Sequence, residues 1–126
     1  MLGTFQQSRL RIEVEATPGQ IQASLTQPGK FRQWLWPQRL AEGLPDQLQT
    51  GLVFSSYIGP LELRHEVTQA TENSLHMRLS GGIDGFHEWY WGESWVQSRL
   101  EGISPLPLNL GQSLVMFRLR QFLQHR

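Results

Sequence analysis

Residues 51–101 alternate between apolar and polar side chains with a period of two, and no other feature of the chain constrains its fold as strongly. Such alternation is typical of β-strands that bury one face. The alternation recurs in "LVFSSYI", "LELRHEV", "LHMRLS" and the longer "FHEWYWGESWVQSRLEG". These segments are separated by turn sequences such as "GGIDG". The stretch "RLRIEVEA" near the N-terminus alternates in the same way. Because short turns join most of these segments, the sequence predicts six strands that pair largely antiparallel.

The last two strands carry three of the five tryptophans of the chain. A two-residue loop at Gly92-Glu93 would place glycine first, as a type II′ turn prefers. This register sets Tyr90 opposite Trp95 on the outer, mostly polar face. Trp89 and Trp91 then point into the protein, because neighbouring side chains of a strand face opposite ways.

Two short helices are predicted after the first strand. The sequence "TPGQ" at 17–20 has the pattern of a capping box, with Pro18 at the first helical position. Pro28 is suited to begin a second helix and Pro37 to end it.

The C-terminal segment "LGQSLVMFRLRQFLQHR" predicts a long amphipathic helix. Asn109 is the expected N-cap, with Gln112 three residues later completing a capping box. The apolar residues divide into a main face (Val115, Leu119 and Phe122, flanked by Met116 and Leu123) and a nearly opposite face (Leu110, Leu114 and Phe117).

Length and composition narrow the class of protein. The 126 residues fit one domain, 1–126. The formal net charge is zero, which argues against a nucleic-acid partner. No apolar stretch approaches the length that spans a bilayer, and the N-terminus lacks a signal-peptide pattern. The absence of cysteine excludes disulfides and thiolate chemistry, and a cytoplasmic location is expected.

The order of elements and the segment "IEVEATPGQIQASLTQPGKFRQWLWP" at 12–37 resemble the START-like (SRPBCC, helix-grip) superfamily. The resemblance is to its short polyketide cyclase/dehydrase-like and coenzyme Q-binding-like members. It covers nearly the whole chain and rests on a strand, a helix beginning at Thr-Pro, and a Pro-x-x-Phe-x-x-Trp segment that closes in proline. The family usually has seven strands, one more than the alternation shows, and no set of its catalytic residues is found here.

The resemblance implies an α+β, helix-grip fold, in which a curved antiparallel sheet of six or seven strands wraps around the C-terminal helix. It also implies a cavity between the sheet and this helix for a hydrophobic or amphipathic molecule such as a lipid, an isoprenoid quinone or a polyketide-like compound. No cofactor is expected. The inward-facing residues predicted to bind the ligand are Trp34, Phe54, Ser56, Leu63, His65, Met77, His87, Trp89, Trp91, Ser98, Val115, Leu119 and Phe122.

Two kinds of candidate residue carry an alternative interpretation. The indoles of Trp89 and Trp91 would stack on a flat ligand, helped by Trp34 or Trp36 at the mouth, or they simply fill the core. His65 and His87 would orient a ligand carbonyl or act as a general base, or they are structural histidines. A metal site is not expected, because a third protein ligand cannot be named.

Three functions follow from these alternatives. The first is a carrier or sensor of a small apolar molecule, without chemistry, and it is the one that the residues favour. The second is a cyclase or aldol-type enzyme that uses a cavity histidine as its base. The third is a protein-interaction module with weak homodimerisation, suggested by outward-facing Tyr90, Trp95, Leu114 and Phe117.

Overall fold

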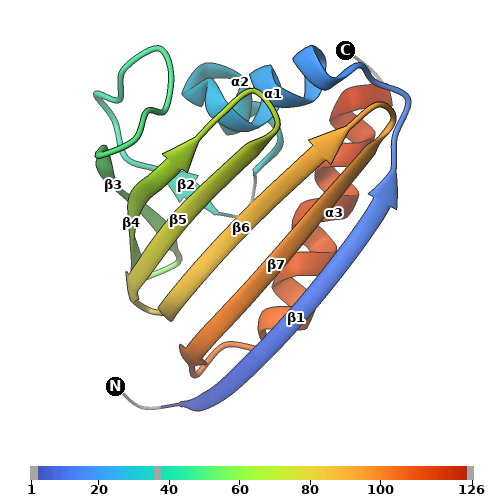
Figure 1. Ribbon diagram of the computed structural model, residues 1–126. Helices are drawn as coiled ribbons and strands as arrows, with labels where there is room; N and C mark the ends of the chain where they lie inside the picture. The colour runs from blue at the N-terminus through green and yellow to red at the C-terminus, as the bar shows by residue number, and fades with distance from the viewer. Residues whose placement is uncertain (1–2, 36–37, 125–126) are drawn as a thin grey trace.

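A single antiparallel sheet of seven strands forms the frame of the protein, in the order β1-β7-β6-β5-β4-β3-β2. The computed structural model describes residues 3–35 and 38–124. Figure 1 shows the sheet curving around one long helix. The strands are β1 (Thr4–Glu13), β2 (Arg39–Leu40), β3 (Val53–Ile58), β4 (Leu61–Ala70), β5 (Ser74–Gly81), β6 (Asp84–Gly92) and β7 (Trp95–Ser104), and the helices are α1 (Pro18–Thr26), α2 (Pro28–Trp34) and α3 (Leu108–Gln124).

This architecture is the α+β helix-grip fold that the resemblance implies. Six of the strands follow the alternating segments. The seventh, β2, is only two residues long, and Arg39 and Leu40 pair with Tyr57 and Ser56 at the edge of the sheet. A two-residue strand leaves no detectable alternation, which is why the sequence shows six.

The two short helices begin where the prolines indicate. The hydroxyl of Thr17 accepts a hydrogen bond from the backbone N–H of Gln20, whose side chain accepts one from the N–H of Thr17, so the predicted capping box is confirmed. α2 begins at Pro28 and ends at Trp34. Trp36 and Pro37 lie outside the described residues.

The start of α3 differs from the prediction. The helix begins at Leu108, whose backbone N–H donates to the side-chain oxygen of Gln6 on β1, 3.0 Å away. Gln6 therefore satisfies one of the free N–H groups that every helix start leaves, in place of the predicted Asn109 cap. Gln112 is buried inside the protein and has a different role, described below.

The β6–β7 hairpin keeps the predicted faces but has another register. Gly92 pairs with Trp95, so the loop is Glu93-Ser94 instead of Gly92-Glu93. The shift moves each partner by two positions, which leaves every side chain on the same face of the sheet. The predicted cross-strand pair of Tyr90 and Trp95 is therefore wrong: Tyr90 pairs with Gln97.

α3 closes the concave face of the sheet. Figure 1 shows it crossing behind β6, β7 and β1, with α1 and α2 at one end of the sheet. Leu119 and Leu123 are completely buried and Met116 is nearly so, whereas Leu114 and Phe117 are 40% and 55% exposed. The two predicted apolar sides of the helix thus meet different surroundings, one the core and the other solvent.

Candidate functional site

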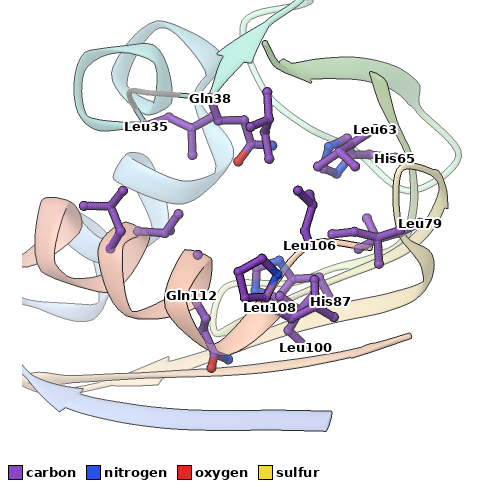
Figure 2. Close-up of a pocket in the computed structure, with 16 residues that line it drawn as sticks. Leu35, Gln38, Leu63, His65, Leu79, His87, Leu100, Leu106, Leu108 and Gln112 are labelled. Carbon is purple, nitrogen blue, oxygen red and sulfur yellow. The ribbon is translucent and has the colours of Figure 1, made fainter. Parts of the chain in front are cut away.

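A cavity of about 200 Å³ lies between the concave face of the sheet and the first half of α3. Apolar side chains make up most of its lining, and no charged residue occurs among the lining residues that the structure describes. Figure 2 shows the labelled residues gathered around this space. The lining consists of Leu35, Gln38, Ile58, Leu63, His65, Leu79, Ile83, His87, Leu100, Leu106, Pro107, Leu108, Gly111, Gln112, Leu114 and Val115.

The exposed members of this lining mark the mouth of the cavity. Pro107, Gly111 and Leu114 are exposed, whereas Leu63, His65 and Leu100 at its inner end are buried. An ideal Cβ placed on Gly111 would meet no atom within 4 Å. Gly111 thus has open space beside it in the exposed part of the lining.

Four polar side chains also line the cavity, in two pairs that come from distant parts of the chain. Gln112 of α3 and His87 of β6 form one pair, and Gln38 and His65 of β4 form the other. Figure 2 draws Gln38 and His65 above the cavity and Gln112 and His87 below it. In each pair a buried serine behind the lining connects the amide to the imidazole.

The first connection is the Gln112–Ser98–His87 chain. The amide nitrogen of Gln112 donates to the carbonyl oxygen of Ser98 (3.0 Å) and to its hydroxyl (3.1 Å). The Ser98 hydroxyl in turn lies 2.7 Å from Nε2 of His87. Ser8 on β1 holds the amide from the other side: its hydroxyl donates to Oε1 of Gln112 and its carbonyl accepts from Nε2. These hydrogen bonds therefore connect α3, β1, β6 and β7.

The second connection is the Gln38–Ser56–His65 chain. Nε2 of Gln38 donates to the Ser56 hydroxyl over 2.6 Å, and this hydroxyl lies 2.8 Å from Nε2 of His65. The imidazole stacks on the ring of Phe54, with centroids 4.6 Å apart and the planes nearly parallel. Nδ1 of His65 is buried and has no hydrogen-bond partner among residues 3–35 and 38–124.

Both imidazoles are held neutral by their surroundings. Burial lowers the pKa of His65 to about 4. Burial also lowers the pKa of His87 to about 3, with a smaller contribution from the neighbouring His65. The cause is the cost of placing a charge in an apolar environment that offers no carboxylate among the described lining residues.

The structure brings four of the predicted ligand-binding residues into the cavity lining: Leu63, His65, His87 and Val115. Ser56 and Ser98 lie directly behind it and bond its histidines. The other seven are outside the lining: Trp34, Phe54, Met77, Trp89, Trp91, Leu119 and Phe122.

The three predicted indoles are part of the core. Trp34, Trp89 and Trp91 are 2% exposed or less, and Trp34 packs edge-on against Trp89. The indole N–H of Trp34 donates to the carbonyl of Ser24, and that of Trp91 to the carbonyl of Glu72. These rings supply packing volume at the end of the sheet near α1 and α2, and they do not line the cavity.

Gln38 and Gln112 are the polar lining residues that the sequence reasoning missed. Gln112 had a usable signal: with Leu108, Met116 and Leu119 it shares the helical spacing of the buried stripe, so its side chain had to point inward. Gln38 stands in a segment without periodicity and offered no such signal.

The described residues form neither a metal-binding cluster nor a membrane-spanning helix. Among residues 3–35 and 38–124, no group of three or more His, Cys, Asp or Glu side chains is arranged to hold a metal ion. No helix in the described part of the chain is long and apolar enough to cross a membrane.

The same fold occurs in solved structures of low sequence identity. Protein CV1439 from Chromobacterium violaceum has a TM-score of 0.73 and 13% identity, over 94% of this chain and 96% of its own. The Aha1 dimer from Colwellia psychrerythraea has a TM-score of 0.65 and 14% identity, over 94% and 96%. DynU16, a protein in the dynemicin biosynthetic locus, has a TM-score of 0.69 and 19% identity over 94% of this chain but 47% of its own, so this chain spans about half of it.

These likenesses are consistent with a helix-grip fold and show the fold alone. No protein-family model and no curated protein matches the sequence.

Proposed function

We propose that this protein binds a small, mainly apolar molecule in the cavity between the sheet and α3, as a carrier or sensor. The observation that carries the proposal is the cavity itself: apolar walls, a few placed polar groups and a mouth at Gly111. This combination is the usual composition of a ligand pocket. A likeness to a protein of a biosynthetic locus is compatible with a small-molecule ligand.

The size of the cavity limits what it holds. An engineered cavity of about 150 Å³ accommodates benzene, whereas drug-sized ligands occupy pockets of about 300–1,000 Å³. A space of about 200 Å³ therefore suits a compact molecule of one ring with a few further atoms, or one end of a longer molecule that leaves through the mouth.

The pKa values of the histidines favour binding over the cyclase or aldol-type alternative. A general base works best when its pKa is near the working pH. Imidazoles with pKa values of about 4 and 3 are weak bases at neutral pH, and the described lining residues offer no carboxylate to raise them. They remain good hydrogen-bond donors and acceptors, which is what a binding site requires.

Replacing Gly111 by leucine tests the proposal. The added side chain would enter the open space at the mouth, so it should block the cavity while the helix keeps or gains stability. After incubation with a lipid extract and re-isolation, native mass spectrometry should show about tenfold less bound compound on Gly111→Leu than on the wild type, because excluding a ring-sized group forfeits more than about 1.4 kcal/mol of apolar burial.

Gly29→Leu is the matched control, because Gly29 is also exposed, helical and free of atoms within 4 Å of an ideal Cβ, but lies on α2 away from the cavity lining. It should retain the compound as the wild type does. A wild-type protein that emerges empty, or equal loading of all three proteins, would contradict a ligand site in this cavity.

A further inference from the structure

The exposed side of α3 carries an apolar stripe of three residues, Leu110, Leu114 and Phe117. Their side chains are 65%, 40% and 55% exposed. At 3.6 residues per turn, they lie within about 60° of one another around the helix axis. They make up half of the six large apolar side chains that are exposed among residues 3–35 and 38–124. The stripe is therefore a concentrated patch of apolar surface that the rest of the described chain leaves uncovered.

The stripe adjoins the cavity. Leu114 belongs to both, because it is exposed on α3 and also lines the cavity. Gly111 and Pro107, which mark the mouth, lie in the first turn of α3 and just before it. Figure 1 shows this beginning of α3 at the end of the sheet away from α1 and α2. A surface that covers the stripe therefore also lies against the mouth of the cavity.

The charged residues of α3 are all basic. They are Arg118 and Arg120, and the sequence has no Asp or Glu after Glu101. Helical spacing places the two arginines about 80° to either side of the stripe. Nε of Arg118 donates to the carbonyl of Trp34, 3.3 Å away, which holds this side chain beside α2. Arginines that flank an apolar stripe are suited to contact anionic headgroups while the apolar side chains enter the layer below.

The extent of the stripe distinguishes a lipid surface from a protein partner. A stable protein interface takes about 20–30 residues from each side and requires matching shapes. The stripe offers three apolar side chains, and the exposed residues that continue it, Gln121 and Gln124, are polar. A lipid layer requires no matching shape, because each apolar side chain that enters it leaves water separately. A lipid surface of negative charge therefore fits both the size of the stripe and the charges beside it.

We propose that α3 docks transiently on an anionic lipid surface through Leu110, Leu114 and Phe117, with Arg118 and Arg120 at the headgroups. The role of this docking rests on the proposed function: it places the mouth of the cavity against the layer, so an apolar ligand passes between the two without crossing water. Three partly exposed side chains give weak, reversible binding, which suits a carrier that has to leave the surface again.

Vesicle flotation measures the docking without any ligand. The wild type should bind vesicles of equal parts phosphatidylcholine and phosphatidylglycerol about fivefold more tightly than vesicles of phosphatidylcholine alone, and high salt should remove this difference. Phe117→Ser should weaken binding to the mixed vesicles about tenfold, because a half-exposed aromatic side chain no longer enters the layer.

Phe5→Ser is the matched control. Phe5 is also more than half exposed, but it lies on β1, where its neighbour Gln6 faces α3. Because neighbouring side chains of a strand face opposite ways, Phe5 is on the other face of the sheet. This variant should bind the mixed vesicles as the wild type does. Phe5 and Phe117 both lie outside the cavity lining, so both variants should retain the bound compound in the mass-spectrometric comparison.

Three results would overturn the docking. The first is a wild type that binds neither kind of vesicle, and the second is an equal loss of binding in Phe117→Ser and Phe5→Ser. The third is a wild-type dimer in light scattering that Phe117→Ser converts to a monomer, which would assign the stripe to a second copy of the chain. A protein that carries a compound but ignores vesicles overturns the docking alone, whereas one that binds vesicles through Phe117 and emerges empty overturns the proposed function and leaves the docking in place.

Discussion

Replacing Gly85 by alanine is expected to destabilise the protein by about 3 kcal/mol, because the two strands at this point leave no room for a side-chain atom. Gly85 of β6 pairs directly with Gly102 of β7. An ideal Cβ on Gly85 would overlap the carbonyl oxygen of Glu101 and lie 2.5 Å from Cα of Gly102. These neighbours are backbone atoms of a paired strand, so they cannot move aside without breaking the hydrogen bonds of the ladder.

The comparison that tests this expectation uses urea unfolding of Gly85→Ala, Gly102→Ala and Gly29→Ala. A Cβ on Gly102 would lie 2.7 Å from the carbonyl oxygen of Asp84, so this variant should also lose stability. Gly29→Ala should be neutral or more stable by about 0.4–1 kcal/mol, since its Cβ meets nothing and alanine lowers the entropy of the unfolded chain. Equal unfolding midpoints for Gly85→Ala and Gly29→Ala would show that the strands adjust freely.

The glycine pair also matters for the site. Ile83, two residues before Gly85, lines the cavity, and Leu100, two residues before Gly102, lines it as well. Facing glycines allow the backbones of β6 and β7 to approach more closely than side chains permit, which is typical of a tight bend in a sheet. A variant that forces these strands apart is therefore expected to disturb the cavity along with the fold.

The fold was predictable because alternation depends only on whether a position is odd or even. In β6 and β7 the predicted loop was wrong, yet Trp89, Trp91 and Ser98 still lie on the buried face, because the register shifts by two positions and preserves parity. Predictions of individual cross-strand partners were wrong, because they depend on the exact register. Trp95, for example, lies beside Gly92 and under the guanidinium of Arg11, and does not face Tyr90.

The site was harder to predict, because burial and cavity lining are different properties. Alternation identifies Trp89 and Trp91 as inward, but it cannot tell whether an inward ring faces a void or other side chains. The bulkiest inward residues fill the end of the sheet near α1 and α2, and the cavity is left where leucines, isoleucines and two histidines stand instead. The serines behind these histidines form bonds between residues 9 and 11 positions apart, which no local pattern indicates.

Acidification should destabilise the protein through its two neutral histidines. This loss of stability should begin at a higher pH than the loss caused by protonation of the carboxylates. Their pKa values in the folded protein, about 4 and about 3, are below the value near 6.5 expected in the unfolded chain. Between these values the unfolded chain takes up protons that the folded protein does not, so stability is complete above about pH 6.5 and falls as the pH decreases. His65 alone is expected to lower the free energy of unfolding by about 3 kcal/mol by about pH 4, because each unit by which its pKa is lowered corresponds to about 1.4 kcal/mol.

Urea unfolding of the wild type and of His65→Phe at several pH values from about 7 to 4 measures this contribution, because the carboxylates are common to both proteins and cancel in the difference. Between about pH 7 and 4, the free energy of unfolding of the variant should fall by about 3 kcal/mol less than that of the wild type. In the wild type, the Cε1–H resonance of His65 should not titrate above about pH 5, a measurement that requires no variant to fold. A resonance that titrates near pH 6.5 would mean that water reaches the imidazole freely, and it would contradict the buried, apolar environment that lowers its pKa.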